Sequence, residues 1–235
     1  MRRSKLYKKQ VEIDGFDAQQ RYGVVEAINL LKAMPSVKFD QTAEVAIRLG
    51  VDPRKSDQTV RGAVALPAGT GKSVRVAVVA DGQYAVDAKE AGADFVGYED
   101  IVQQIKDGWQ DFDILIATPD AMRLVRPLGR QLGPRGLMPN PKTGTVTESV
   151  GAAVKEAKAG RAEFRADRGA VVHVPFGKMS FEVDALKQNF DALVEAVNKA
   201  KPTTAKGTYI LSCTISATMT PGVKINLKEL VRSEK

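Results

Sequence analysis

The spacing of hydrophobic residues changes twice along the chain. In residues 42–49 every second side chain is apolar, which predicts a strand with one buried face. The same alternation predicts further strands over residues 60–67, 161–167, 169–178, 208–218 and 222–227. Residues 22–34 and 183–200 have helical spacing instead and predict two amphipathic helices. Both outer parts of the chain therefore combine alternating strands with one long helix each.

The middle of the chain has a different pattern. Its apolar residues form short, nearly continuous runs at 74–80, 94–97 and 113–118, as expected for strands covered on both faces. Helical stretches lie between these runs and after them, ending at residue 92 and covering residues 99–108 and 149–160. Strands that alternate with helices in this way are typical of a layered α/β domain with a mostly parallel sheet.

These patterns predict two domains of mixed α/β and α+β class. Residues 1–66 and 160–235 would form one discontinuous α+β domain from both chain ends. Residues 67–159 would form an α/β domain inserted into it, and the chain would cross between the two near residues 66–71 and 160.

The positive charge of the chain lies in the outer segments. The net charge is +7 and the pI is near 9.4. Residues 67–159 contain 11 Lys and Arg against 12 Asp and Glu, whereas the rest of the chain contains 24 against 16. If the outer segments form one body, that body is the expected binder of a polyanion.

Composition also limits the class of protein. A hydrophobic content of 43% and a charged content of 27% are typical of a soluble globular protein. No apolar run has the length of a membrane span, and the basic N-terminus is not followed by the apolar core of a secretory signal. We therefore expect a cytosolic protein without a membrane partner.

A stretch rich in Gly and Pro lies at residues 128–146. It contains four Gly and three Pro, a density that argues against any helix or strand and predicts a stiff loop. Arg130, Arg135 and Lys142 lie within it. Three cations on a stiff backbone suit a secondary RNA contact, but they equally suit a rigid connection between domains with solvated charges. The sequence leaves both interpretations open.

Motifs that resemble catalytic or nucleotide sites lack the context they need. The sequence PAGTGKS at 67–73 has Leu66 where a phosphate-binding loop needs its first Gly, and a strand follows where a helix is required. His173 is the single histidine and has no second His, Cys or acidic pair nearby in sequence. Cys213 is also single. We expect no catalytic residue, no metal ion and no cofactor.

Hydroxyl side chains occupy alternate positions of the strand predicted at 208–218. Ser212, Thr214, Ser216 and Thr218 project to one face at a period of two. A row of hydroxyls suits hydrogen bonds to ribose 2′-OH groups and phosphates, although a solvent-facing side of an antiparallel sheet would show the same pattern. The basic excess of the outer segments favours RNA.

Four long stretches together resemble one known family. LGPRGLMPNPKTGTV at 132–146 is similar to the signature of the ribosomal protein L one family, the stalk proteins of the large ribosomal subunit. Residues 38–62, 111–120 and 206–219 resemble the same family in the same order, so the similarity covers nearly the whole chain.

The resemblance implies a fold and a function. It implies a split β-α-β domain I formed from both termini and a Rossmann-like domain II inserted into it. It implies binding to a stem and loops of large-subunit ribosomal RNA, which form a mobile stalk near the site where deacylated tRNA leaves. In bacteria it also implies repression of the protein's own operon through its messenger RNA. We expect a protein of the cytoplasmic ribosome that is monomeric when free.

The family's main RNA contacts lie in domain I. Carried over position by position, they are Lys38, Phe39, Thr42, Ser212, Thr218 and Met219. The family usually has Gly after Thr-Met, whereas this chain has Thr220 followed by Pro221 and Gly222. How this turn contacts RNA is therefore open, and Gly222 would supply flexibility one step later.

An alternative function uses the inserted domain. Its alternating strands and helices, together with the GTGKS segment, also fit a nucleotide-binding enzyme or switch. Binding of ATP, GTP or NAD would distinguish this alternative from an RNA-binding protein.

Overall fold

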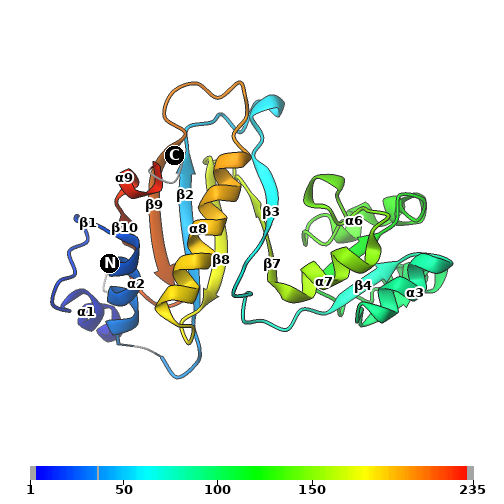
Figure 1. The fold of residues 1–235 in the computed structure, drawn as a ribbon, viewed down its shortest axis with the longest axis horizontal. Coiled ribbons are helices and arrows are strands. Elements are labelled where there is room, and N and C mark those ends of the chain that lie inside the picture. Colours follow the sequence, from blue (N-terminus) through cyan, green and yellow to red (C-terminus); the bar gives the residue numbers. More distant parts are fainter. Residues whose placement is uncertain (1–3, 36, 232–235) are drawn as a thin grey trace. The chain divides into compact units, whose positions relative to one another are not determined.

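The computed structural model describes residues 4–35 and 37–231, with the side chains of Ser56, Lys142 and Val231 left undescribed. The chain divides into two compact units. Unit 1 combines Met1–Gly71 with Ala162–Lys235, and unit 2 is Lys72–Arg161 (Figure 1). Within the described residues no helix is long and apolar enough to cross a membrane. The mixed class predicted from the sequence is confirmed, with strands and helices in both units.

Unit 1 is built on a five-stranded sheet. In spatial order its strands are β1 (Arg21–Tyr22), β10 (Val223–Ile225), β9 (Ile210–Ala217), β2 (Thr42–Leu49) and β8 (Val171–Lys178). The central strands β9, β2 and β8 are antiparallel, and β1 runs parallel to β10. The helices of this unit are α1 (Lys5–Val11), α2 (Val24–Ala33), α8 (Val183–Lys199) and α9 (Leu227–Val231).

One face of this sheet forms the core of unit 1. The odd-numbered side chains of β2, such as Val45 and Ile47, are at most 1% exposed and pack with apolar residues of α2 and α8. Phe176 of β8 meets Phe190 of α8 edge to face, with ring centroids 5.9 Å apart. The alternation in the sequence therefore marks the face that the helices cover.

A second, two-stranded sheet in this unit refines one prediction. The sequence predicted residues 161–167 and 169–178 as adjacent strands, and the two segments do meet at an antiparallel bridge between Ala166 and Val172. Along their length, however, β7 (Arg161–Arg165) pairs with β3 (Arg61–Ala65), whereas β8 pairs with β2. Gly62 explains the pairing, because a Cβ there would lie only 2.7 Å from the Phe164 ring. The absence of a side chain at Gly62 lets the aromatic ring of one strand lie on the other.

Unit 2 is a three-layered α/β fold. Its parallel sheet has the order β5 (Phe95–Gly97), β4 (Val76–Val79) and β6 (Ile114–Ala117). All four side chains of β4 are buried, as expected for a strand covered on both faces. The helices are α3 (Gln83–Glu90), α4 (Glu99–Lys106), α5 (Met122–Val125), α6 (Gly129–Leu132) and α7 (Val150–Gly160). Trp109 packs on Phe95 and Phe112 at one edge of the core.

The stretch at 128–146 contains helical turns, so the prediction that it forms no helix was wrong. Residues Gly129–Leu132 form α6, and Pro141–Thr143 form a 3-10 turn. The helix is possible because its glycine is the first residue and Pro134 follows its end, so no proline breaks its hydrogen bonds. Leu132 anchors it in the core of unit 2.

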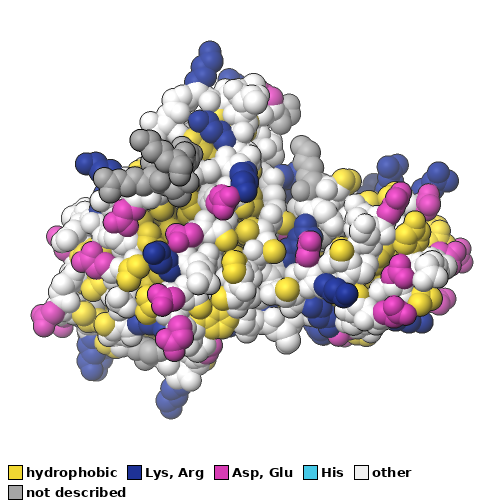
Figure 2. Space-filling view, viewed as in Figure 1, with side chains coloured by type: hydrophobic (Ala, Val, Ile, Leu, Met, Phe, Trp, Pro, Cys, Tyr) yellow, Lys and Arg dark blue, Asp and Glu magenta, His cyan; other side chains and the backbone are white. Residues whose placement is uncertain are grey.

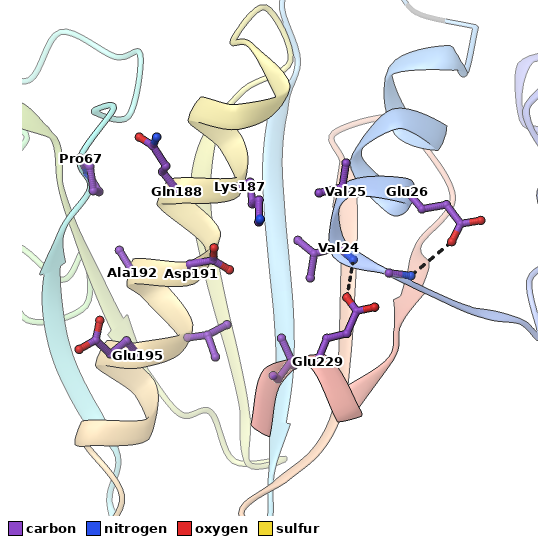
Figure 3. A pocket seen from close by; sticks show the side chains of 13 residues that line it. Val24, Val25, Glu26, Pro67, Lys187, Gln188, Asp191, Ala192, Glu195 and Glu229 are labelled. Carbon is purple, nitrogen blue, oxygen red and sulfur yellow. Dashed lines mark hydrogen bonds between the residues drawn. The ribbon is translucent and has the colours of Figure 1, made fainter. Parts of the chain in front are cut away.

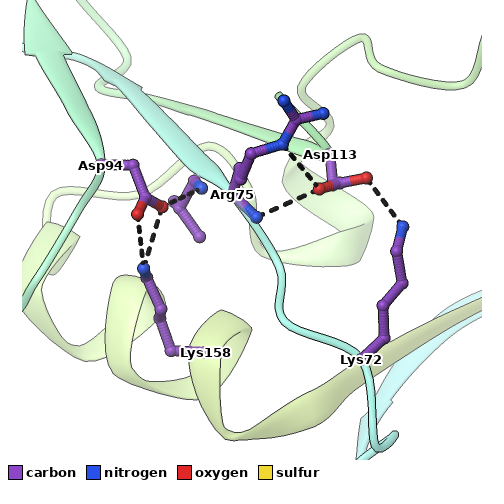
Figure 4. A network of polar contacts seen from close by, with 6 residues as sticks. Lys72, Arg75, Asp94, Asp113 and Lys158 are labelled. Carbon is purple, nitrogen blue, oxygen red and sulfur yellow. Dashed lines mark hydrogen bonds and ion pairs between the residues drawn. The ribbon is translucent and has the colours of Figure 1, made fainter. Parts of the chain in front are cut away.

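Two carboxylates fasten the first strand of unit 2. Asp113 accepts hydrogen bonds from the Lys72 ammonium at 2.8 Å and the Arg75 amide at 3.1 Å (Figure 4). Asp94 accepts from the Val76 amide at 2.7 Å and pairs with Lys158. Lys72 contributes most to lowering the pKa of Asp113, and Arg75 adds to this against an opposing effect of burial.

Replacing Asp113 with Asn should destabilise unit 2 by about 1–2 kcal/mol at neutral pH, because charge-assisted bonds to Lys72 and Arg75 are lost. The pKa of Asp113 is lowered from its ordinary 3.8, so this stability is present above pH 3.8 and is lost as pH falls through the lower folded value. Urea unfolding followed by Trp109 fluorescence should show the deficit shrinking below about pH 4. Exposed Asp111→Asn is the control, and an equal loss there would contradict the role given to Asp113.

Candidate nucleic-acid interface

The face of the large sheet opposite α2 and α8 is uncovered and polar. The register places Ser212 of β9 beside Arg48 of β2, with Thr214 beside Ala46 and Ser216 beside Glu44. Within the described chain the hydroxyls of these three β9 residues form no internal hydrogen bond, so they are available to a ligand. The three even-numbered β9 positions predicted to share a face do share it.

Three cations lie on this face, hereafter the open face. Arg48 extends from β2, and Lys224 of β10 lies between Thr214 and Arg21 in register. All three cationic side chains are exposed, and none is in an ion pair within the described part of the protein. Glu44 is the acidic residue of this face on β2. Cations beside free hydroxyls can contact phosphate and ribose together.

Thr42 and Thr218 meet at one end of this sheet. The Thr42 amide donates to the Thr218 hydroxyl at 3.1 Å, and the Lys178 ammonium donates to the Thr42 hydroxyl at 2.9 Å. The Met219 amide donates to Gln41 Oε1 at 2.8 Å. These bonds fix the turn after β9 against the start of β2. Thr218 is thus held by β2 and continues the hydroxyl row just beyond the strand.

Two large apolar side chains are exposed beside this contact. Phe39 is 52% exposed and Met219 is 51% exposed. Asp40 accepts hydrogen bonds from the Ser180 amide and hydroxyl, which holds the segment that carries Lys38 and Phe39. Exposed apolar groups on a fixed backbone can lie flat against sugars or bases.

The six residues carried over from the family therefore fall into two places. Lys38, Phe39, Thr42, Thr218 and Met219 lie together at one end of the sheet, hereafter the end cluster. Ser212 lies six residues along β9 from Thr218, a distance of about 20 Å at the rise of an extended strand. It belongs to the open face rather than to the end cluster.

Sequence reasoning missed the polar residues that support these positions. Gln41 and Ser180 hold the end cluster through contacts to residues 178 and 140 positions away in the chain. Arg48 and Lys224 could have been found from strand parity, because they share the period of the hydroxyl row. The partners of Gln41 and Ser180 depend on tertiary approach, for which the sequence carries no local signal.

The turn after β9 is closed by its own threonine. The Thr220 hydroxyl accepts from the Ala217 amide at 2.8 Å and donates to the Ala217 carbonyl. Gly222 is not in the left-handed region, and the need for glycine there is steric, because a Cβ would lie 2.8 Å from Thr214 Cγ2. Gly222 therefore permits close packing on β9, where the sequence suggested flexibility.

The cations predicted in the Gly- and Pro-rich stretch lie in unit 2. Arg130 and Arg135 are exposed, and the side chain of Lys142 lies outside the described part of the structure. The Asn140 amide donates to Thr145 Oγ1 at 2.8 Å, which keeps the returning chain against β6. These residues stay candidates for a secondary RNA contact or a connecting loop.

The other candidate motifs have structural roles. Lys72 of the GTGKS segment pairs with Asp113 and is followed by strand β4. His173 is an exposed strand residue, and among the described residues no group of three His, Cys, Asp or Glu could hold a metal ion. Burial raises the pKa of Cys213 to about 12, so its thiol is unreactive near neutral pH.

Comparison with known proteins identifies the family. Residues 31–221 match the model of the Ribosomal protein L1p/L10e family. A large ribosomal subunit protein uL1 from Teredinibacter turnerae is 57% identical over 228 residues, covering 97% of this chain and 99% of the relative. The protein of the same name from Chlamydia pneumoniae is 53% identical over 221 residues, covering 94% and 95%.

A polar, cationic sheet face is the kind of surface with which proteins bind nucleic acids. The family match at residues 31–221 extends over most of the chain and includes the end cluster together with the β2 and β9 residues of the open face. The chain belongs to the Ribosomal protein L1p/L10e family, and it is an RNA-binding ribosomal protein rather than an enzyme.

Proposed function

We propose that this protein is a structural constituent of the large ribosomal subunit in the cytoplasm, where unit 1 binds ribosomal RNA. The observation that carries the proposal is the free hydroxyl row flanked by Arg48 and Lys224 on the open face, continued by the end cluster. The names of the relatives, large ribosomal subunit proteins, support the same assignment.

The surface suits recognition of RNA shape. A-form RNA presents 2′-hydroxyls and phosphates across a wide, shallow minor groove. Ser212 and Thr214 can exchange hydrogen bonds with ribose, and the cations can neutralise phosphates. Phe39 and Met219 supply flat apolar contact where bases or sugars are exposed in loops. Such binding fits a stem with adjoining loops, as expected for the stalk.

The chain segment between the units suits a moving stalk. Asn189 of α8 holds Ala68 and Gly69 on unit 1, whereas Asp113 holds Lys72 and the Arg75 amide in unit 2. Thr70 and Gly71 lie between these anchors, and Gly71 has a φ of 70°. We infer that rotation about this pair, and at Gly160 on the return crossing, lets an RNA-bound stalk swing and assist release of deacylated tRNA.

We further propose that the same surface binds the messenger RNA of the protein's own operon and represses its translation. A messenger RNA that folds like the ribosomal stem would present the same riboses and phosphates to the open face. Free protein would then bind the messenger only when ribosomal RNA is saturated. Ribosomal RNA fragment should therefore compete with the messenger for one site, and binding of both at once would contradict this part of the proposal.

Ser212→Ala and Thr218→Ala should each weaken binding to the ribosomal RNA fragment by about 1–3 kcal/mol. Ser212 would lose a direct hydrogen bond, whereas Thr218→Ala would release the turn that carries Met219. Filter-binding titrations of both variants measure the effect, with Ser73→Ala in unit 2 as the matched control. Unchanged affinity in both variants would remove the hydroxyl row from the interface.

A further inference from the structure

The helix-covered side of unit 1, opposite the open face, carries a groove. It has a volume of about 890 Å³ and is lined by parts of α2, α8 and α9, together with Pro67 (Figure 3). Val24, Val194 and Leu230 form a buried apolar floor, and Val25 of α2 is 40% exposed at its side. All of these residues belong to unit 1.

The groove is acidic on a body that is otherwise basic. Its lining contains Glu26, Asp191, Glu195 and Glu229, with Lys187 as the cation among the lining residues. In Figure 2 acidic side chains and apolar surface alternate over this part of the protein. A cationic partner would meet favourable charge here, whereas RNA would be repelled.

The four carboxylates differ in how far their charge is already compensated. Glu229 accepts from the Val24 amide at 3.1 Å, and Glu26 accepts from the Gly23 amide at 3.4 Å, so both sit at the N-terminus of α2. Glu195 pairs with Lys199, but both side chains are well exposed, so the pair is weak.

Asp191 is the groove carboxylate that has no hydrogen-bond or ion-pair partner among the described residues. It is exposed, it projects from α8 toward α2 (Figure 3), and in the described structure it accepts no hydrogen bond. The partial burial at the foot of its side chain raises its pKa, and Lys187 only partly opposes this effect. An incoming ammonium or guanidinium would stabilise its charged form.

From the apolar floor and acidic rim we propose that this groove docks a lysine- or arginine-rich amphipathic segment of another protein. Its apolar side chains would cover Val25 and the floor, and its cations would pair with Asp191 and Glu195. A helical segment fits because its apolar residues recur on one face at intervals of three and four. The inference does not depend on the RNA proposal, because the groove and the open face lie on opposite sides of the sheet.

The test measures fluorescence anisotropy of a labelled 18-residue peptide with leucines at helical spacing and lysines elsewhere, titrated with the full chain at about 0.15 M salt. We expect saturable binding that weakens at least tenfold in the double variant Asp191→Asn, Glu195→Gln, and at least tenfold in Val25→Asp. Glu182→Gln with Asp184→Asn removes the same charge at the start of the same helix, outside the groove, and should change binding less than twofold.

Two further controls separate this site from the others. A peptide with every leucine changed to serine should not bind, and Arg48→Gln with Lys224→Gln should leave peptide binding unchanged. Equal losses in the groove and control variants, or binding of the serine peptide, would overturn the proposal in favour of unspecific charge attraction. The groove variants should keep full affinity for ribosomal RNA. Failure of the peptide-docking proposal can therefore be distinguished from failure of the proposed RNA-binding function.

Discussion

Replacing Asn189 with Leu is expected to lower the free energy of unfolding of unit 1 by about 3 kcal/mol. The Asn189 side chain is 0% exposed and makes three hydrogen bonds. Its Oδ1 accepts from the Ala68 amide at 2.9 Å, and its Nδ2 donates to the carbonyls of Gly69 at 2.9 Å and Phe176 at 2.8 Å.

The size of this effect follows from the three backbone groups left behind. Leucine fills a similar volume but offers no polar atom, so one amide and two carbonyls lose their partner in a mostly buried place. Each unsatisfied group costs about 1–3 kcal/mol, and the partly exposed segment at Ala68 and Gly69 can recover some of this from water. A total near 3 kcal/mol is therefore expected rather than the full sum.

Urea unfolding followed by circular dichroism measures this loss. Asn198→Leu on the same helix is the control, because its side chain makes no hydrogen bond within the described structure and is only half-buried. Trp109 lies in unit 2, so its fluorescence transition should stay in place if the units unfold independently. A loss of the same size in both variants would show that the three hydrogen bonds carry no net stability.

The sequence predicted the elements of unit 1 well where one face is buried. Val45 and Ile47 alternate with polar residues because the helices cover only one side of β2. The alternation of apolar and polar residues in the sequence therefore predicted which side chains are buried. The continuous run at Val76–Val79 likewise predicted a strand covered on both sides. In both cases the local hydrophobic pattern reflects how many faces of the strand are covered in the folded protein.

Strand partners and the details of the end cluster were not predictable in this way. The pairing of β7 with β3 depends on Gly62 leaving space for the Phe164 ring, and the period of either strand does not contain that information. The sequence did not predict Gln41 as a site residue, because its hydrogen-bond partner Met219 lies 178 positions away in the chain. Strand parity places both Ser212 and Arg48 on a polar face, but only the observed register shows that the two residues are neighbours.

Removing the cations of the open face is the second large effect we expect. In the full chain, Arg21→Gln, Arg48→Gln and Lys224→Gln together should raise the Kd for the ribosomal RNA fragment at least a hundredfold at about 0.15 M salt, because roughly three phosphate contacts are lost. The slope of log affinity against log salt should become shallower by roughly 2–3. The triple variant keeps the buried face of the sheet, so its thermal stability should change little.

The direct test of the account compares this variant with a matched triple in unit 2, Arg130→Gln, Arg135→Gln and Lys142→Gln. Both variants lose three positive charges, so a difference between them reports where RNA binds. Filter-binding titrations across a range of salt concentrations should show the large loss and the shallower slope only for the open-face variant. Near-normal RNA affinity in that variant, with the loss appearing in the unit 2 variant, would contradict RNA binding by the sheet face of unit 1.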